Sequence, residues 1–272
     1  MKRLIGIVLF CIFVFGGVAY ADLTDGLIAY YPFNGNAHDE SGNGNHGEPY
    51  FPTLTDDMFG NPECAYSFDG IDDHIRVPDS DSLDVTDGIT IAAWVNINPH
   101  GGGRSQIVDS RDGAIHAPGY AMSIDTDIIG MSVPSGPGGF GVEVEPYVWH
   151  HVAGTYDGVT FIIYLDGEMV GNALLSTPFE QSTATLNIGT TYNGINHFDG
   201  IMDELRIYNR ALSETEIEEL ILETGPPCDA DYNDDGIVDW KDRINKRADL
   251  MREARQEFRD WLENCWLQEY TQ

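Results

Sequence analysis

Lysine is missing from residues 22–227 of this 272-residue chain, although acidic residues occur throughout it. Over the whole chain 45 Asp and Glu face only 14 Lys and Arg, which gives a formal net charge of −31. A surface of that sign repels nucleic acid and anionic membranes, so we expect neither as a partner. An acidic surface is compatible with divalent cations or neutral sugars as ligands. Solubility in a saline medium explains the same charge equally well. The cations of the lysine-free region are Arg76, Arg104, Arg111, Arg206 and Arg210.

Long apolar runs are also scarce. The run at residues 4–15 follows Lys2 and Arg3, and the triplet Ala19-Tyr20-Ala21 comes after it. This order is typical of a secretory signal cleaved before Asp22, and the run is shorter than the roughly 20 apolar residues that a membrane span needs. We therefore expect residues 1–21 to be a signal peptide, the protein to be secreted into an extracellular or periplasmic space, and no transmembrane segment.

Cysteine is rare as well. Beyond the signal peptide the chain keeps Cys64, Cys228 and Cys265. An odd number leaves at least one thiol unpaired within the chain, and Cys64 could be a plain core residue, so the disulfide pairing stays open.

Helical periodicity is absent from the long stretch that follows the signal peptide. Short runs of alternating apolar residues are separated there by Gly, Asn, Asp and Pro, as in an all-β sandwich. Asp166-Gly167 predicts a hairpin turn. Ser213 with Glu216 predicts a capped helix, and Ile217, Leu220 and Ile221 lie on its inner face. The clearest strand runs are residues 27–33, 89–95, 160–165 and 201–208.

Five segments of this region resemble, in order, the concanavalin A-like, laminin G-like jelly roll that is related to pentraxins. The resemblance implies an all-β fold of two antiparallel sheets over residues 22–224, and a binding or adhesion module more than any one ligand. The segments are D-G-L-I-A-Y-Y-P-F-N-G-N-A-H-D-E-S-G-N-G-N-H-G from Asp25, F-D-G-I-D-D-H-I from Phe68, I-T-I-A-A-W-V from Ile89, W-H-H-V-A-G-T-Y-D-G from Trp149 and F-D-G-I-M-D-E-L-R-I-Y-N-R-A-L-S from Phe198.

The loop at residues 190–197 is the candidate ligand-binding region. Pentraxins hold calcium there with a Glu-Gln-Asp run, but this loop has no carboxylate, so calcium-dependent phosphocholine binding is not implied. Its aromatic and amide groups suit a sugar or a peptide, and the family's loop order places it opposite Asp109, Arg111 and His116. The candidate ligand-binding residues are Tyr192, Asn193 and His197.

Catalytic carboxylates are not evident. Glycoside hydrolases of this fold carry them on one strand as E-x-D-x-x-E or E-x-D-x-E, and neither string occurs in the chain. We therefore expect a non-catalytic protein that binds a carbohydrate or another extracellular polymer, or an extracellular protein. Two alternatives stay open: a carbohydrate-active enzyme or its accessory subunit, and a structural component of a cell surface or matrix.

Asp203 in the last strand run raises a question about a second metal ion. The period-2 rule places Asp203 on one face with three apolar residues, Ile201, Leu205 and Ile207. A carboxylate in such a place needs a cation or several hydrogen-bond donors. A structural calcium ion held by Asp39, Asn43 and Asp203 would supply the cation. A salt bridge to Arg206 or Arg210, or backbone hydrogen bonds, would serve equally well.

Residues 231–242 read D-Y-N-D-D-G-I-V-D-W-K-D, with oxygen-bearing side chains at loop positions 1, 3, 5, 9 and 12 and glycine at position 6. This spacing is typical of an EF-hand calcium loop, in which the glycine makes the sharp turn. Gly and two Pro directly upstream exclude an entering helix, so the loop resembles one repeat of a dockerin. A full dockerin has two repeats, and cohesin binding is therefore not implied. The expected Ca²⁺ ligands are Asp231, Asn233, Asp235, Ile237 through its carbonyl, Asp239 and Asp242.

The C-terminal residues predict one long amphipathic α-helix. Residues 240–268 contain no Gly or Pro, and Ile244, Met251, Phe258 and Cys265 repeat every seven residues. We expect this helix to dock on the sandwich or on a partner. The calcium loop and the helix together form a small module at residues 225–272.

Overall fold

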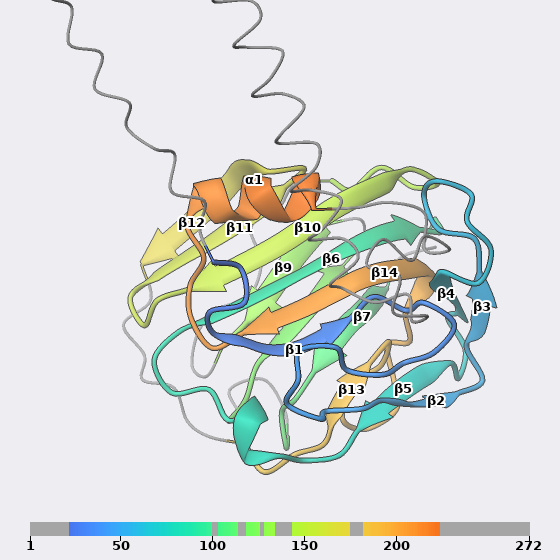
Figure 1. The fold of residues 1–272 in the computed structure, drawn as a ribbon, viewed down its shortest axis with the longest axis horizontal. Coiled ribbons are helices and arrows are strands. Elements are labelled where there is room, and N and C mark those ends of the chain that lie inside the picture. Colours follow the sequence, from blue (N-terminus) through green and yellow to red (C-terminus); the bar gives the residue numbers. More distant parts are fainter. Residues whose placement is uncertain are drawn as a thin grey trace, which may run out of the picture.

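The computed structural model describes residues 22–99, 103–113, 118–125, 128–133, 143–174 and 182–223. The expected signal peptide, calcium loop and C-terminal helix lie outside these residues, as do His116, Cys228 and Cys265. The described residues form a sandwich of two antiparallel sheets, one in front of the other in Figure 1. The predicted fold, an all-β jelly roll, is confirmed.

The first sheet, sheet A, contains eight strands among the described residues and is built around β14. One edge of β14 pairs with β6, and the other edge is shared by β4 and β1. The order is β12-β11-β10-β6-β14-β4-β3, with β1 beside β14. The strands are β1 (Leu27–Tyr31), β3 (Thr53–Thr55), β4 (Ala65–Asp69), β6 (Ile89–Ile97), β10 (Trp149–Tyr156), β11 (Thr160–Leu165), β12 (Glu168–Leu174) and β14 (Asp199–Tyr208).

The second sheet, sheet B, has the strand order β2-β5-β13-β7-β8-β9 in the described residues. A short 3₁₀ helix, η1 (Asp81–Leu83), follows β5. The strands of sheet B are β2 (Glu48–Tyr50), β5 (His74–Val77), β7 (Arg104–Asp109), β8 (Ala121–Asp125), β9 (Ile128–Ser132) and β13 (Leu186–Ile188).

The core lies between the two sheets and contains apolar side chains from both. Successive residues of a strand point to opposite faces, so a strand that packs on the core contributes every second residue. Sheet A contributes Ile91, Val95, Val152, Leu205 and Ile207, among others. Sheet B contributes Ile75, Val77, Met122, Ile124, Leu186 and Ile188.

Two local predictions from the sequence are confirmed. Asp166 and Gly167 have φ angles of 52° and 86°, the left-handed pair that a two-residue hairpin turn between β11 and β12 requires. Helix α1 (Glu214–Leu222) begins with a complete capping box between Ser213 and Glu216. Its apolar side packs on the outer face of sheet A, where Figure 1 shows α1 beside β10, β11 and β12.

No helix in the described ranges is long and apolar enough to cross a membrane.

One expected face assignment is wrong. The pairing of β14 with β6 shifts register between Asp203 and Arg206, and Glu204 has a left-handed φ of 53°. This bulge exchanges the faces of the strand, so that Met202 joins Leu205 and Ile207 in the core. Asp203, next to Met202 in an extended strand, therefore does not share the core face, and its Oδ1 accepts a hydrogen bond from the Glu204 N–H at 2.8 Å.

Cys64 is buried and disulfide-bonded. No other cysteine belongs to the described residues. The unpaired core thiol considered for Cys64 is thereby excluded.

A histidine is buried on β10. The His151 ring lies 5.4 Å from that of Trp94, and within the described part of the chain neither His151 Nδ1 nor Trp94 Nε1 has a hydrogen-bond partner. Burial, together with the nearby positive charge of Arg206, lowers the pKa of His151 to about 3. The folded protein therefore holds this ring neutral under conditions in which the unfolded chain protonates it.

His151 should make the fold sensitive to acid. Between the unfolded pKa of about 6.5 and the folded value of about 3, only the unfolded state gains a proton, so stability falls as the pH falls. The limiting slope is about 1.4 kcal/mol per pH unit. We expect His151→Gln to flatten the free energy of unfolding against pH between pH 6 and 4, measured by urea denaturation. His38→Gln, which changes an exposed histidine, should keep the wild-type slope, and an unchanged slope in His151→Gln would contradict the assignment.

Candidate functional site

A row of polar side chains crosses the outer face of sheet B. The apolar residues of β5 and β13 point into the core, so Arg76 and Asn187 point away from it. Strand register places Glu48 opposite Arg76, Arg76 opposite Asn187, and Asn187 opposite Asp109. Residues paired in this way have neighbouring side chains, so the row joins β2, β5, β13 and β7.

The surface is hollowed over this row. The hollow, here called the outer-face groove, has a volume of about 430 Å³ and is open to solvent. Its floor comes from β5 and β13, and its walls come from the residues after β7 and the loop after β13. The residues that line it are His74, Arg76, Arg111, Asp112, Ala184, Thr185, Asn187, Thr190, Thr191, Tyr192 and Gly194.

Two aromatic rings stack beside the groove. Tyr50 of β2 lies opposite His74 of β5, and their ring planes are 3° from parallel at a centroid distance of 4.9 Å. The Tyr50 side chain stays 38% exposed. The stack gives this end of the groove a flat, rigid, partly apolar surface.

A buried ion pair supports one wall. Arg111 donates from Nε and Nη2 to the two carboxylate oxygens of Asp109, at 2.8 and 2.9 Å. Asp109 also accepts the backbone N–H of Arg111 at 3.0 Å and that of Tyr192 at 3.3 Å. The Asp109 side chain is fully buried. The carboxylate thus links the end of β7 to the loop at residues 190–197, and the expected position of that loop opposite Asp109 and Arg111 is confirmed.

The loop at residues 190–197 is held by its own short contacts. Thr191 Oγ1 lies 2.6 Å from the carbonyl oxygen of Ile195 and accepts the Ile195 N–H at 3.1 Å. Gly189, at the start of the loop, has φ of 83°, and a Cβ atom there would come within 2.7 Å of the Phe68 ring. Only glycine fits this junction without a shift of the core.

The three predicted ligand-binding residues have different positions. Tyr192 lines the groove and is 42% exposed. Asn193 is exposed nearby but does not line the groove, and its Oδ1 lies 2.7 Å from Thr191 Oγ1. His197 Nε2 lies 3.0 Å from the Gly194 carbonyl oxygen and Nδ1 lies 3.4 Å from that of Asp73, so both ring nitrogens face backbone carbonyls. The geometry gives His197 a supporting position and leaves Tyr192 as the side chain available to a ligand.

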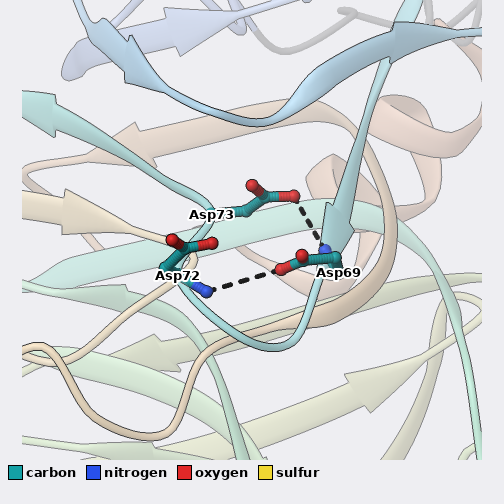
Figure 2. A group of neighbouring side chains, drawn as sticks. All are labelled: Asp69, Asp72 and Asp73. Carbon is teal, nitrogen blue, oxygen red and sulfur yellow. Dashed lines mark hydrogen bonds between the residues drawn. The ribbon is translucent and has the colours of Figure 1, made fainter.

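An acidic cluster lies in the turn between β4 and β5. Asp69, Asp72 and Asp73 each place an oxygen within 4.8 Å of the others, and Figure 2 shows the three around the turn. Asp73 Oδ2 accepts the Asp69 N–H at 2.9 Å, and Asp69 Oδ1 accepts the N–H of Ile71 at 2.8 Å. Burial raises the pKa of Asp73. Hydrogen bonds to the turn backbone account for this cluster, and we assign no metal to it.

The residues expected to hold a second calcium ion form hydrogen bonds with backbone groups. Asp39 Oδ1 accepts the N–H groups of Tyr30 and Ser41, and its Oδ2 accepts that of Asn45, each at 2.9 Å. The Asn43 amide donates to the Leu27 carbonyl at 3.0 Å. Asp203 lies off the core face because of the β14 bulge. The Asp203 carboxylate therefore does not need a calcium ion to offset burial in an apolar core. The second calcium site stays an untested prediction.

Three residues of the groove region were not identified from the sequence: Tyr50, His74 and Arg76. Their neighbourhood depends on the pairing of β2 with β5 and of β5 with β13, strands far apart in the chain. Within β5 the alternation His-Ile-Arg-Val carried a usable signal, because it predicts that His74 and Arg76 share one face.

Comparison with known proteins identifies the fold family. The family model of the concanavalin A-like lectin/glucanases superfamily matches residues 69–218. No curated protein matches the sequence significantly.

Solved structures share the fold at low sequence identity. Domain 4 of AbnA, a GH43 extracellular arabinanase from Geobacillus stearothermophilus, in complex with arabinotriose, matches 71% of this chain and 97% of its own, at 22% identity and a TM-score of 0.56. The binding domain of Paraclostridial Mosquitocidal Protein 1 matches 75% of this chain, at 17% identity and a TM-score of 0.60. The ligand-binding domain of botulinum neurotoxin serotype D, in complex with N-acetylneuraminic acid, matches 74% at 16% identity and 0.58. The match spans only about half of each toxin domain, 54% and 52%.

Breaking the buried ion pair under the groove should destabilise the fold. Asp109→Asn leaves the buried Arg111 guanidinium without its counter-charge, which typically costs about 3–5 kcal/mol. We expect that loss in the free energy of unfolding from urea denaturation. Asp125→Asn is the matched control, because its pair with Arg104 is solvent-exposed and such pairs contribute about 0–1 kcal/mol. Equal effects of the two substitutions would contradict a supporting role for Asp109.

Proposed function

This chain belongs to the concanavalin A-like lectin/glucanases superfamily, and we propose that its jelly roll is a non-catalytic carbohydrate-binding module. The observation that carries the proposal is the outer-face groove, with the exposed Tyr192 on one wall and the Tyr50–His74 stack at one end. Sugars have weakly apolar ring faces and polar edges. A groove with exposed aromatic rings and polar side chains complements both.

The dimensions of the groove support this proposal. Its volume of about 430 Å³ is within the usual range for small-ligand sites, about 300–1,000 Å³. Its open form suits a short stretch of a polymer, and its walls are fixed before a ligand arrives. We expect weak binding, because few contacts must offset the cost of association.

The structural relatives point in the same direction. One of them is a domain in complex with arabinotriose and another is a toxin domain in complex with N-acetylneuraminic acid. At 22% and 16% identity they share the fold, and their ligands are properties of those proteins. They support the proposal because each was solved with a saccharide bound.

The acidic groups of the groove favour binding over catalysis. Hydrolysis of a glycosidic bond uses one carboxylic acid and one carboxylate about 5–10 Å apart. Asp109 accepts four hydrogen bonds from Arg111 and Tyr192 and is fully buried. Asp109 is therefore committed to the ion pair behind the wall, and Asp112 is the one carboxylate among the described residues that line the groove.

We further propose that the C-terminal loop at residues 231–242 binds one calcium ion and that the mature protein is exported. Both follow from the sequence: the oxygen spacing of the loop and the N-terminal signal. An exported module with its own calcium loop would act outside the cell, where calcium is plentiful.

Tyr192 should be needed for glycan binding. Loss of its ring removes a stacking surface worth roughly 1 kcal/mol, or about fivefold in affinity. We expect wild-type protein to bind glycans on a printed array and Tyr192→Ala to lose most of that signal, with a melting temperature within a few degrees of wild type.

Tyr147→Ala is the matched control, since Tyr147 is 69% exposed and does not line the groove. Its binding should equal that of wild type. Retained binding in Tyr192→Ala would place the site elsewhere, and turnover of an array glycan would overturn the non-catalytic assignment.

Calcium binding should depend on loop position 1. We expect isothermal titration of the full-length protein to detect calcium binding at this loop, and Asp231→Ala, which removes the first ligand, to abolish binding there. Asp234→Ala changes an acidic residue at loop position 4, which is not a ligand, and should bind as wild type does. Absence of calcium heat in the wild type, or equal binding in both variants, would refute the site.

A further inference from the structure

Arg76 is the one arginine of the described residues without an ion pair. Arg104 pairs with Asp125, and Arg111 with Asp109. The other two each have two carboxylate partners: Glu204 and Glu223 for Arg206, and Asp25 and Glu216 for Arg210. In a domain so rich in acidic residues, a free guanidinium is exceptional, and this one lies in the outer-face groove.

The neighbours of Arg76 leave its guanidinium available. Glu48 lies opposite it on β2, but Glu48 Oε2 is 3.2 Å from the Tyr50 hydroxyl and makes no ion pair with Arg76. On the other side, the Asn187 amide donates to the carbonyl oxygens of Thr185 at 3.1 Å and Asp109 at 3.4 Å. Arg76 itself is exposed. Its donors therefore face the groove without a partner among the described residues.

We propose that the groove selects saccharides that carry a carboxylate on the sugar ring, and that Arg76 binds this carboxylate. A planar guanidinium matches a carboxylate through two parallel hydrogen bonds. The Tyr50–His74 stack, next to Arg76 on the same face, would contact the sugar ring that bears the acid. This inference rests on the proposed function and names the ligand class of the same site.

The net charge of the chain does not exclude an acidic ligand. Exposed charges further apart than about 8 Å are largely screened at physiological ionic strength, so contacts within the groove determine the selectivity. There Arg111 is neutralised by Asp109, and the charged groove residues without an ion pair to another described residue are Arg76 and Asp112. The screened acidic surface should have little effect on the association rate, so the preference for the acid should come from contacts in the bound state.

Uronic acids and sialic acids both supply a ring carboxylate, so the test uses one acid and one matched neutral saccharide of each kind. The probes are trigalacturonate with its methyl ester, and 3′-sialyllactose with lactose. Affinity is measured by isothermal titration of the full-length protein. We expect at least one acid to bind about tenfold more tightly than its neutral partner, the usual effect of a charge-assisted hydrogen bond, with a preference that falls as salt rises.

Arg76→Gln should abolish the preference and leave the melting temperature unchanged, because Arg76 is exposed and unpaired. Arg104→Gln removes the same charge outside the groove and should keep the preference. Equal affinity for acid and neutral probes, or a preference that survives in Arg76→Gln, overturns the inference. If no probe binds while a glycan array finds a neutral ligand, the inference fails and the proposed function stands. If the array finds no ligand either, both fail.

Discussion

Everything at the candidate site depends on the packing of the two sheets against each other. The core takes every second residue of β5 and β13, so Ile75, Val77, Leu186 and Ile188 point inward. Because side chains alternate along a strand, the neighbouring residues His74, Arg76 and Asn187 lie on the outer face. A slip of one residue in either strand would exchange core and groove residues, which the loss of buried apolar surface forbids. The composition of the groove floor is thus a consequence of the core.

A second constraint fixes the wall of the groove. The buried Asp109 carboxylate is satisfied only when the Arg111 guanidinium and the Tyr192 N–H are both in place. Replacing such a pair by apolar residues is often tolerated, whereas breaking it is costly, so the arrangement sets a geometry more than it adds stability. A wall formed in advance reduces the ordering cost of binding. That matters for a site with few contacts.

Sequence patterns correctly predicted the features that depend on residues close together in the chain. The capping box at Ser213, the Asp166-Gly167 turn and the principal strand runs all depend on residues close together in the chain. The β14 bulge was missed because a strict two-residue period has no place for the extra residue at Glu204. The groove was only partly found: Tyr192 belonged to a recognisable loop, whereas Tyr50 and Arg76 join it through pairing between distant strands.

We propose that a saccharide binds in the outer-face groove of sheet B. Titration of ¹⁵N-labelled protein with an oligosaccharide that the array identifies tests it most directly, through the amide resonances that shift. We predict that the largest shifts cluster at His74 to Arg76, Asn187 and Thr190 to Gly194, the residues of the groove floor and wall. Shifts concentrated on the outer face of sheet A, around β10 and α1, or in residues 225–272, would place the binding site outside the groove.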